Sequence, residues 1–169
     1  TKTFEDVLKA VSNKGLKVNA PIPGTYIKLG NATCTILAPN SSKYDETNNH
    51  SIVIRLTHGN NSFLFTGDSE SVSEKEMIEK GFDLSADVLK VAHHASKSST
   101  TQDFLDRVNP KYAVISVGYD NKYGHPDKAV VDRLKKKDII IYRTDENGTI
   151  IATSDAKSIV FNLGKGEEK

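Results

Sequence analysis

The chain has 169 residues, 23 lysines and arginines against 22 aspartates and glutamates, and a single cysteine, Cys34. This length suits one domain with a sizeable core, and no apolar run approaches the roughly 18 residues of a membrane-spanning helix. One cysteine excludes a disulfide framework and a thiolate metal cage, and the near-neutral charge balance disfavours a polybasic nucleic-acid module. Any metal ion must therefore be held by histidines and carboxylates.

The first half of the chain alternates helical and strand patterns. Residues 3–13 predict a helix, because their apolar side chains fall on one stripe and Gly15 follows as a stop signal. The further expected elements are strands over 25–29 and 33–37, a polar loop over 39–49, a hairpin of strands over 51–57 and 62–66, and a helix that starts at Ser73 with Glu76 as a capping box and ends before Gly81.

The second half repeats strand and helix with short connections. Its expected elements are a buried strand over 87–92, a helix over 101–108, a buried strand over 112–117, a helix over 127–136, and strands over 139–142, 149–152 and 158–162, with a turn at 146–148. This order predicts the α/β fold class, with mixed β-sheets flanked by helices. Residues 164–169 are expected to form a disordered tail.

The basic residues are unevenly distributed along the chain. Residues 88–143 contain 11 basic and 6 acidic residues, and four of the basic ones close the helix predicted over 127–136. Cations in the last turn of a helix complement its dipole, so a solvated helix end explains most of this cluster. The remaining excess of positive charge suits a phosphate-bearing substrate.

Aspartate or histidine follows each of three buried strands. The residues are Asp68, His93, His94 and His125. Sites in open α/β sheets form outside the carboxyl ends of the strands, so we expect these side chains to meet at one edge of the sheet. The pattern predicts a functional site built from one carboxylate and three imidazoles.

Each of these signals also has a simpler structural explanation. Asp68 follows a glycine, which is typical of a turn or a helix N-cap, and His125 is suited to capping the helix after it. The pair His93 and His94 favours function more strongly, because two adjacent imidazoles are difficult to satisfy in a core. The two other histidines lie beside asparagine-rich turns and are expected to face solvent.

Three short motifs occur in a fixed order along the chain. They are Thr66-Gly67-Asp68, His93-His94-Ala95-Ser96 and Tyr123-Gly124-His125-Pro126. Together with the segments around them, they resemble the metallo-β-lactamase-fold hydrolases, in particular the hydrolase domain of ComEC-type competence proteins of DNA uptake and the related phosphorylcholine esterase branch. The resemblance covers nearly the whole chain.

The resemblance implies a four-layer αββα sandwich, of which residues 1–163 form the C-terminal portion, and a site for two divalent metal ions, zinc or manganese. It implies Asp68 as the carboxylate that bridges the two metals and His94 as a further metal ligand. It implies His93 and His125 as catalytic residues that contact or protonate a phosphate oxygen.

The chain departs from the family pattern at two places. Ala95 stands where the competence-type pattern has glycine. The family's His-x-His-x-Asp-His cluster, which supplies most of the metal ligands upstream of the first helix seen here, occurs nowhere in the sequence. A catalytic zinc normally keeps three protein ligands, so the ligands that remain are too few. We therefore expect this chain, which begins at Thr1, to be part of a hydrolase domain that is inactive alone and binds no metal or one metal weakly.

The expected function is thus that of part of a metal-dependent hydrolase of phosphate esters, a phosphodiesterase or nuclease-like enzyme. The partners expected are the missing N-terminal half of the domain and a phosphate-containing substrate such as DNA or a phosphorylcholine-type ester. Uncovered apolar sheet surface also favours self-association. The resemblance suggests an extracellular or membrane-tethered parent protein. The alternative is a non-catalytic structural or binding module on a degenerate version of the same fold.

Overall fold

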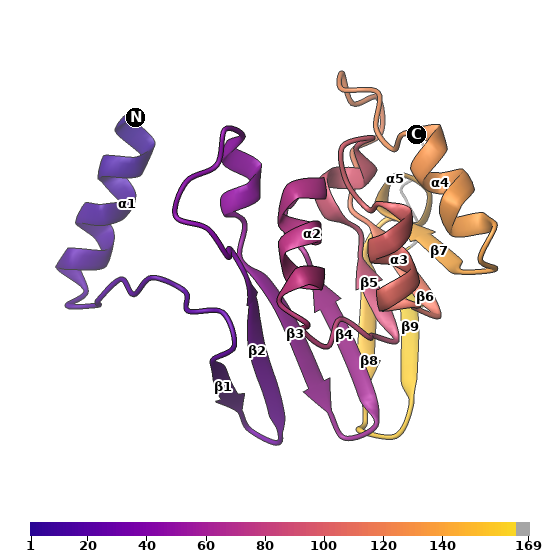
Figure 1. Cartoon of the computed structure of the whole chain (residues 1–169), viewed down its shortest axis with the longest axis horizontal. Helices are drawn as coiled ribbons and strands as arrows, with labels where there is room; N and C mark the ends of the chain where they lie inside the picture. Colours follow the sequence, from indigo (N-terminus) through magenta and orange to yellow (C-terminus); the bar gives the residue numbers. More distant parts are fainter. Residues whose placement is uncertain (165–169) are drawn as a thin grey trace.

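The computed structural model of the chain describes residues 1–164, and its centre is a seven-stranded mixed sheet (Figure 1). The strands lie side by side in chain order, and the first four are antiparallel neighbours while β4 to β7 are parallel. Their bounds are β1 (Tyr26–Leu29), β2 (Ala32–Ala38), β3 (Val53–His58), β4 (Asn61–Phe65), β5 (Val88–Lys90), β6 (Tyr112–Ile115) and β7 (Ile140–Arg143). The predicted α/β class with a mixed sheet is confirmed.

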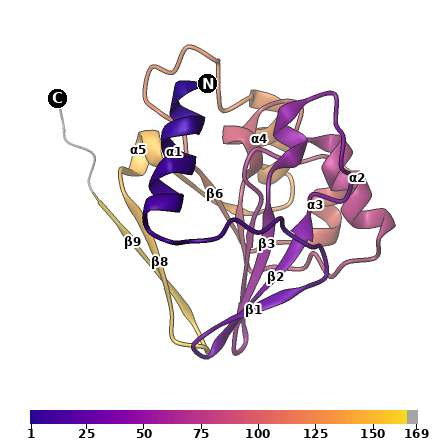
Figure 2. The same ribbon diagram turned by 90° about the vertical axis from the view of Figure 1, so that its left-hand side faces the viewer.

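The two faces of the sheet are covered differently (Figure 2). One face carries the helices α2 (Ser71–Glu79), α3 (Gln102–Val108) and α4 (Lys128–Lys135). The other carries a separate two-stranded hairpin of β8 (Ile150–Ser154) and β9 (Ile159–Leu163). The ring of Phe161 on this hairpin lies 4.8 Å from that of Tyr112 and 4.5 Å from that of Tyr142, so aromatic packing joins the hairpin to β6 and β7.

The main core lies between the sheet and the three helices. Its fully buried side chains come from both layers and include Leu64, Leu89 and Ile115 from the strands and Met77, Phe104 and Leu134 from the helices. The apolar runs of β5 and β6 therefore form buried strands as predicted. Close packing at this interface holds the strand ends, and the loops that follow them, in fixed relative positions.

The helix α1 (Lys2–Asn13) stands apart from the rest of the chain in Figure 1, and none of its residues is buried. Its predicted helical span is confirmed, with the Thr1 side chain as N-cap. The apolar stripe of α1 is nevertheless open to solvent, with Phe4 61% and Val7 54% exposed. Within residues 1–164, no helix is both long and apolar enough to cross a membrane.

The capping box predicted for α2 is wrong. The helix begins at Ser71, and Asn49 in the 3₁₀ turn η1 (Thr47–His50) caps it, because its Oδ1 accepts from the backbone N–H groups of Glu70 and Ser73 at 3.1 and 3.3 Å. Glu76 instead accepts hydrogen bonds from the hydroxyl groups of Tyr44 and Ser41 in the preceding loop. A cap supplied by a distant loop leaves no local signal.

Two smaller predictions also need correction. The expected turn at 146–148 overlaps a short helix, α5 (Thr144–Asn147). His58, expected to be solvated, is partly buried and its Nδ1 lies 3.0 Å from the hydroxyl oxygen of Ser154. Of the predicted tail, Gly164 still pairs with Thr149 through a 2.6 Å backbone hydrogen bond, and residues 165–169 lie outside the described residues.

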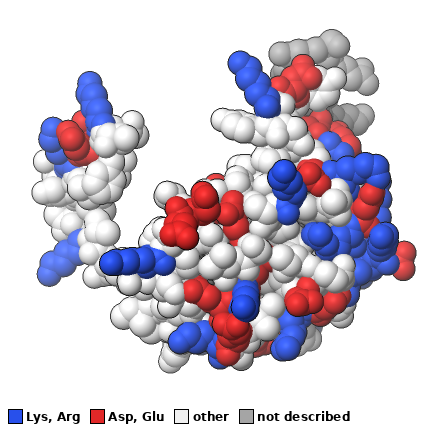
Figure 3. All heavy atoms as spheres, turned by 45° about the horizontal axis from the view of Figure 1, so that its top comes forward, with Lys and Arg blue, Asp and Glu red and all other residues white. Residues whose placement is uncertain are grey.

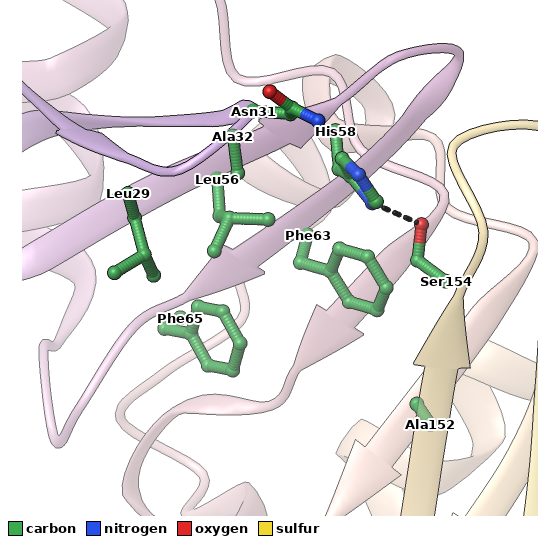
Figure 4. A pocket seen from close by; sticks show the side chains of 9 residues that line it. All are labelled: Leu29, Asn31, Ala32, Leu56, His58, Phe63, Phe65, Ala152 and Ser154. Carbon is green, nitrogen blue, oxygen red and sulfur yellow. Dashed lines mark hydrogen bonds between the residues drawn. The ribbon is translucent and has the colours of Figure 1, made fainter.

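The face of the sheet that carries the β8–β9 hairpin is only partly covered by the described residues. A cavity of about 410 Å³ opens between β1, β3, β4 and β8 (Figure 4), and one of about 220 Å³ lies farther along the same face. Phe65, which is 45% exposed, lines both cavities. We call this apolar region, lined by Leu29, Leu56, Phe65 and Ala152, the open sheet face.

Candidate functional site

The four predicted site residues come together at the carboxyl ends of β4, β5 and β6. Asp68 follows β4, the 3₁₀ segment η2 (Ala92–Ala95) with both adjacent histidines follows β5, and His125 lies in the loop between β6 and α4. The ring centroid of His93 lies 5.6 Å from that of His125 and 6.4 Å from that of His94. Because these strands are parallel neighbours, their ends meet at one edge of the sheet, as expected.

His94 is oriented by a backbone carbonyl. Its Nδ1 lies 2.6 Å from the carbonyl oxygen of Ser116, and a carbonyl oxygen accepts only, so Nδ1 carries the proton. The opposite nitrogen, Nε2, lies 3.7 Å from Oδ1 of Asp68, and in the neutral tautomer with the proton on Nδ1 it carries the lone pair. Metal-binding histidines are typically held this way, with one ring nitrogen donating to the protein and the other free for the metal.

Asp68 is placed by a tight connection between two loops. Its backbone N–H donates to the hydroxyl of Ser51 at 3.0 Å, and the carbonyl of Gly67 accepts from the backbone N–H of His93 at 3.1 Å. Gly67 has φ +54°, and a Cβ there would lie 3.0 Å from Cβ of Ser51. Glycine is required at this position for both reasons, which explains the Gly-Asp pair of the motif.

The paired histidines and the alanine that follows them share an unusual backbone conformation. His93, His94 and Ala95 have φ values of +47°, +55° and +63°, in the left-handed region that costs energy for residues with a Cβ. Such conformations persist where the surroundings hold them, and they concentrate at functional sites. Backbone hydrogen bonds from Ser96 to His93 and from Asp127 to Ala95 hold this segment.

Glu70 is a residue of the site that the sequence interpretation missed. Its Oε1 lies 3.1 Å from Nδ1 of His93 and accepts hydrogen bonds from Ser98 at 2.9 Å and Asn48 at 3.3 Å. A carboxylate only accepts, so Nδ1 of His93 carries the proton of this hydrogen bond and Glu70 orients the ring. The available signal was its place two residues after Asp68, just beyond the first motif.

The loop that carries His125 is braced from within. The Asn121 amide donates to the carbonyls of Gly118 and His125 at 3.1 and 2.6 Å, and its Oδ1 accepts from the backbone N–H groups of Tyr123 and His125. The helix α4 is capped by Asp127, whose Oδ1 accepts from Ala129 at 2.8 Å. A capping role therefore does not explain His125.

Two basic side chains at the site, His125 and Lys90, have pKa values below their usual range. The pKa of His125 is lowered by burial and by the neighbouring His93 and His94, so the ring is neutral near pH 7. Burial also lowers the pKa of Lys90, against the opposing attraction of Asp68, and its Nζ donates to the carbonyl of Val91 at 3.0 Å. The sequence interpretation did not include Lys90, although a lysine within an apolar strand was an available signal.

The side chains at the site are of the kinds that bind a metal ion, but they are too few to hold one. Within the described part of the chain, no group of three or more histidine, cysteine or acidic side chains is close enough to hold one. Asp68 and His94 supply two suitable donor atoms, a carboxylate oxygen and an imidazole nitrogen. A catalytic zinc site normally needs three protein ligands, so this pair does not complete one.

Two of the four basic residues that close α4 make local contacts. In Figure 3, lysines and arginines gather on the side of the molecule where α4 lies. Lys137 pairs with Asp106 at 2.7 Å, Lys128 pairs with Asp132, and the Arg133 guanidinium donates to the carbonyl of Thr100. The solvated helix end explains most of this cluster, as the sequence indicated.

Comparison with known proteins gives consistent matches. Residues 41–119 match the family model described as Metallo-beta-lactamase superfamily, a range that contains Asp68, His93 and His94. The chain is 36% identical over 146 residues to ComE operon protein 3 of Bacillus subtilis, which covers 86% of this chain and 19% of that protein. It is 37% identical over 134 residues to competence protein ComA of Neisseria gonorrhoeae, covering 79% of this chain and 18% of that protein.

A third relative, recombination protein 2 of Haemophilus influenzae, is 36% identical over 115 residues, which are 68% of this chain and 14% of that protein. The chain thus spans about a fifth or less of the length of these relatives. Members of the matched superfamily generally bind divalent metal ions. The mixed sheet, the motifs and the matches agree, and the chain belongs to the metallo-β-lactamase superfamily, as a member similar to the ComEC-type competence proteins.

Proposed function

We propose that the chain is the C-terminal part of a metal-dependent phosphodiesterase domain, whose substrate is the phosphodiester backbone of a nucleic acid. The observation that carries the proposal is the pairing of Asp68 with Nε2 of His94, 3.7 Å apart, beside two further imidazoles. The names of the relatives refer to competence and recombination, which favours a nucleic acid over other phosphate esters.

In this proposal Asp68 and His94 are metal ligands, with zinc or manganese as the ion, and the remaining ligands come from a segment that precedes this chain in a longer parent. Divalent ions at such a site supply positive charge toward the phosphate. Glu70 orients the ring of His93 through Nδ1, and the protonated ring donates from Nε2 to a phosphoryl oxygen. His125, neutral near pH 7, donates from its ring N–H to a phosphoryl oxygen.

The same missing segment is the proposed partner of the open sheet face and of the apolar stripe on α1. Both surfaces are apolar and exposed in the described residues, and the relatives are about five times longer than the matched region. Burial of apolar surface is the dominant favourable term in such packing. In its absence, a second copy of the chain is the expected occupant of the open sheet face.

The test is turnover of a chromogenic phosphodiester, bis(p-nitrophenyl) phosphate, with added zinc or manganese. We expect no turnover by the 169-residue chain and metal-dependent turnover once the preceding segment of its parent is joined to it. Robust turnover by this chain alone contradicts the proposal that the site is incomplete. Failure of the extended domain, or a preceding segment without His-x-His-x-Asp-His, favours the alternative of a non-catalytic binding module, which the incomplete ligand set also permits.

Self-association gives a separate prediction. Phe65→Lys on the open sheet face is expected to weaken self-association of the chain at least about tenfold, because a buried phenylalanine contributes roughly 1.5–3 kcal/mol. Sedimentation velocity over a range of concentrations measures this change. The matched control is Val72→Lys on α2, since Val72 is 51% exposed against 45% for Phe65 but lies on the helical side of the sheet. A monodisperse, cooperatively unfolding wild-type monomer contradicts the prediction.

A further inference from the structure

Two tyrosines project from the loop that carries His125. Tyr119 is 82% exposed and Tyr123 is 84% exposed, the largest exposed fractions among the large apolar side chains of the described residues. Single exposed apolar residues are common on protein surfaces, whereas clustered ones indicate a binding surface. Both tyrosines lie within one loop, beside the proposed site of phosphate hydrolysis.

The exposure of these rings is built into the loop. Between them, Asn121 makes four hydrogen bonds to the loop backbone, two as donor and two as acceptor. A loop braced in this way loses little conformational entropy when a ligand binds, and a tyrosine side chain has few rotatable bonds to immobilise. The loop therefore presents its two aromatic rings in a preorganised form.

Tyr123 also continues a row of nearly parallel rings. Its ring lies 6.1 Å from that of His125 with an interplanar angle of 15°, and His125 lies 6.4 Å from His94 with an angle of 24°. The row begins at the proposed metal ligand and ends at an exposed aromatic face. A flat group that stacks on the exposed face of Tyr123 would extend this row of rings.

We propose that Tyr119 and Tyr123 form a stacking platform for an unpaired nucleobase of a nucleic-acid strand whose phosphate lies at the three histidines. This inference rests on the proposed function, because it takes the phosphate position from it. Base stacking on aromatic side chains tolerates every base and requires a base that is free of its partner, so the platform selects single strands without selecting sequence.

The surrounding charges agree with a strand in this position. Lys97 and Lys122 are exposed cations in the two loops that carry the histidines, and such cations attract the phosphates of a nucleic-acid backbone. The near-parallel rings suit a flat base better than a choline group, since quaternary ammonium ions are bound by aromatic cages. The platform therefore favours a nucleic acid over a phosphorylcholine-type ester.

The first experiment uses the metal-free 169-residue chain with its tyrosine rings isotope-labelled for NMR. We expect a thymidine tetranucleotide to shift the ring signals of Tyr119 and Tyr123 in a saturable manner, and an abasic tetramer of equal charge to leave them in place. Tyr26 on β1, 65% exposed, is the internal control and should not shift. Equal shifts with the abasic tetramer, equal shifts of Tyr26, no shift at millimolar oligonucleotide, or tighter binding of phosphorylcholine each overturn the inference.

The second experiment uses the extended, active domain and two substrates with the same leaving group, the p-nitrophenyl ester of thymidine 5′-monophosphate and methyl p-nitrophenyl phosphate. Wild type should prefer the nucleoside substrate, and Tyr119→Ala/Tyr123→Ala should lower this preference in kcat/KM about tenfold, mainly through KM. Tyr123→Phe should retain the preference because it keeps the aromatic face, whereas Tyr123→Leu should not. Tyr26→Ala is the control.

The two proposals fail in different ways. An active domain whose substrate preference is unchanged in Tyr119→Ala/Tyr123→Ala overturns the stacking platform and leaves the phosphodiesterase proposal intact. An extended domain without turnover contradicts the phosphodiesterase proposal, and the NMR titration then still decides whether the two tyrosines bind a base.

Discussion

Asp68→Asn is expected to lower kcat/KM of the extended domain for a phosphodiester by a factor of about 10³ or more. The substitution keeps the shape of the side chain but removes the negative charge that lies 3.7 Å from Nε2 of His94. It also replaces a carboxylate, one of the two metal donors that this chain supplies at the site, with a neutral and weaker amide oxygen. Turnover measured together with bound metal per protein checks the expectation, because both should fall.

Asp120→Asn is the matched control for this substitution. Asp120 is an exposed carboxylate in the neighbouring loop with φ +54°, a conformation that asparagine adopts readily, so the change removes an equal charge without strain. It should alter kcat/KM by less than about twofold, since an exposed charge is well screened. An Asp68→Asn domain that keeps a tenth or more of wild-type turnover contradicts the proposed role of Asp68.

Combining Asp68→Asn with His94→Ala should cost little more than the larger single change. Residues that act as one unit show strongly non-additive effects, because the first substitution already disables the shared function. If the fold losses in kcat/KM of the two single variants multiply in the double variant, the two side chains do not act at one metal site. The assignment depends on the geometry at the strand ends and does not depend on the identity of the metal.

Glu74→Ala is expected to lower the free energy of unfolding by about 2–4 kcal/mol. The Glu74 side chain on α2 is fully buried, and its carboxylate accepts from the backbone N–H groups of Thr100 and Thr101 at 2.5 and 2.9 Å. Burial raises the pKa of Glu74, while these hydrogen bonds and Arg133 oppose the rise. Alanine leaves two N–H groups at the start of α3 without a partner and opens a cavity beneath them.

Urea unfolding of the 169-residue chain measures this loss. Glu79→Ala is the control on the same helix, because Glu79 is 63% exposed and its contact with Lys75 is a surface pair worth less than about 0.5 kcal/mol. Glu74→Gln keeps one acceptor oxygen and should fall between wild type and Glu74→Ala. A Glu74→Ala loss below about 1 kcal/mol contradicts the view that this carboxylate joins α2 to α3.

Local patterns were sufficient to predict most of the elements. The apolar runs that became β5 and β6 and the helical stripes of α1 and α4 carry their periodicity in neighbouring residues, so the sequence identifies them. The gathering of Asp68 with the three histidines also followed from sequence, because consecutive parallel strands end at the same edge. The cap of α2 by Asn49 did not, since donor and acceptor are 21 residues or more apart along the chain.

The residue types limit the chemistry available to this protein: one cysteine, a carboxylate after a glycine, and histidines after buried strands restrict any metal site to nitrogen and oxygen donors. How these groups are used depends on the folded arrangement. The carbonyl of Ser116, 22 residues after His94, and the carboxylate of Glu70, 23 residues before His93, each accept from the Nδ1 of their histidine. Tautomers and ring orientations depend on partners brought together by packing of the sheet and its loops, and no pattern of neighbouring residues encodes them.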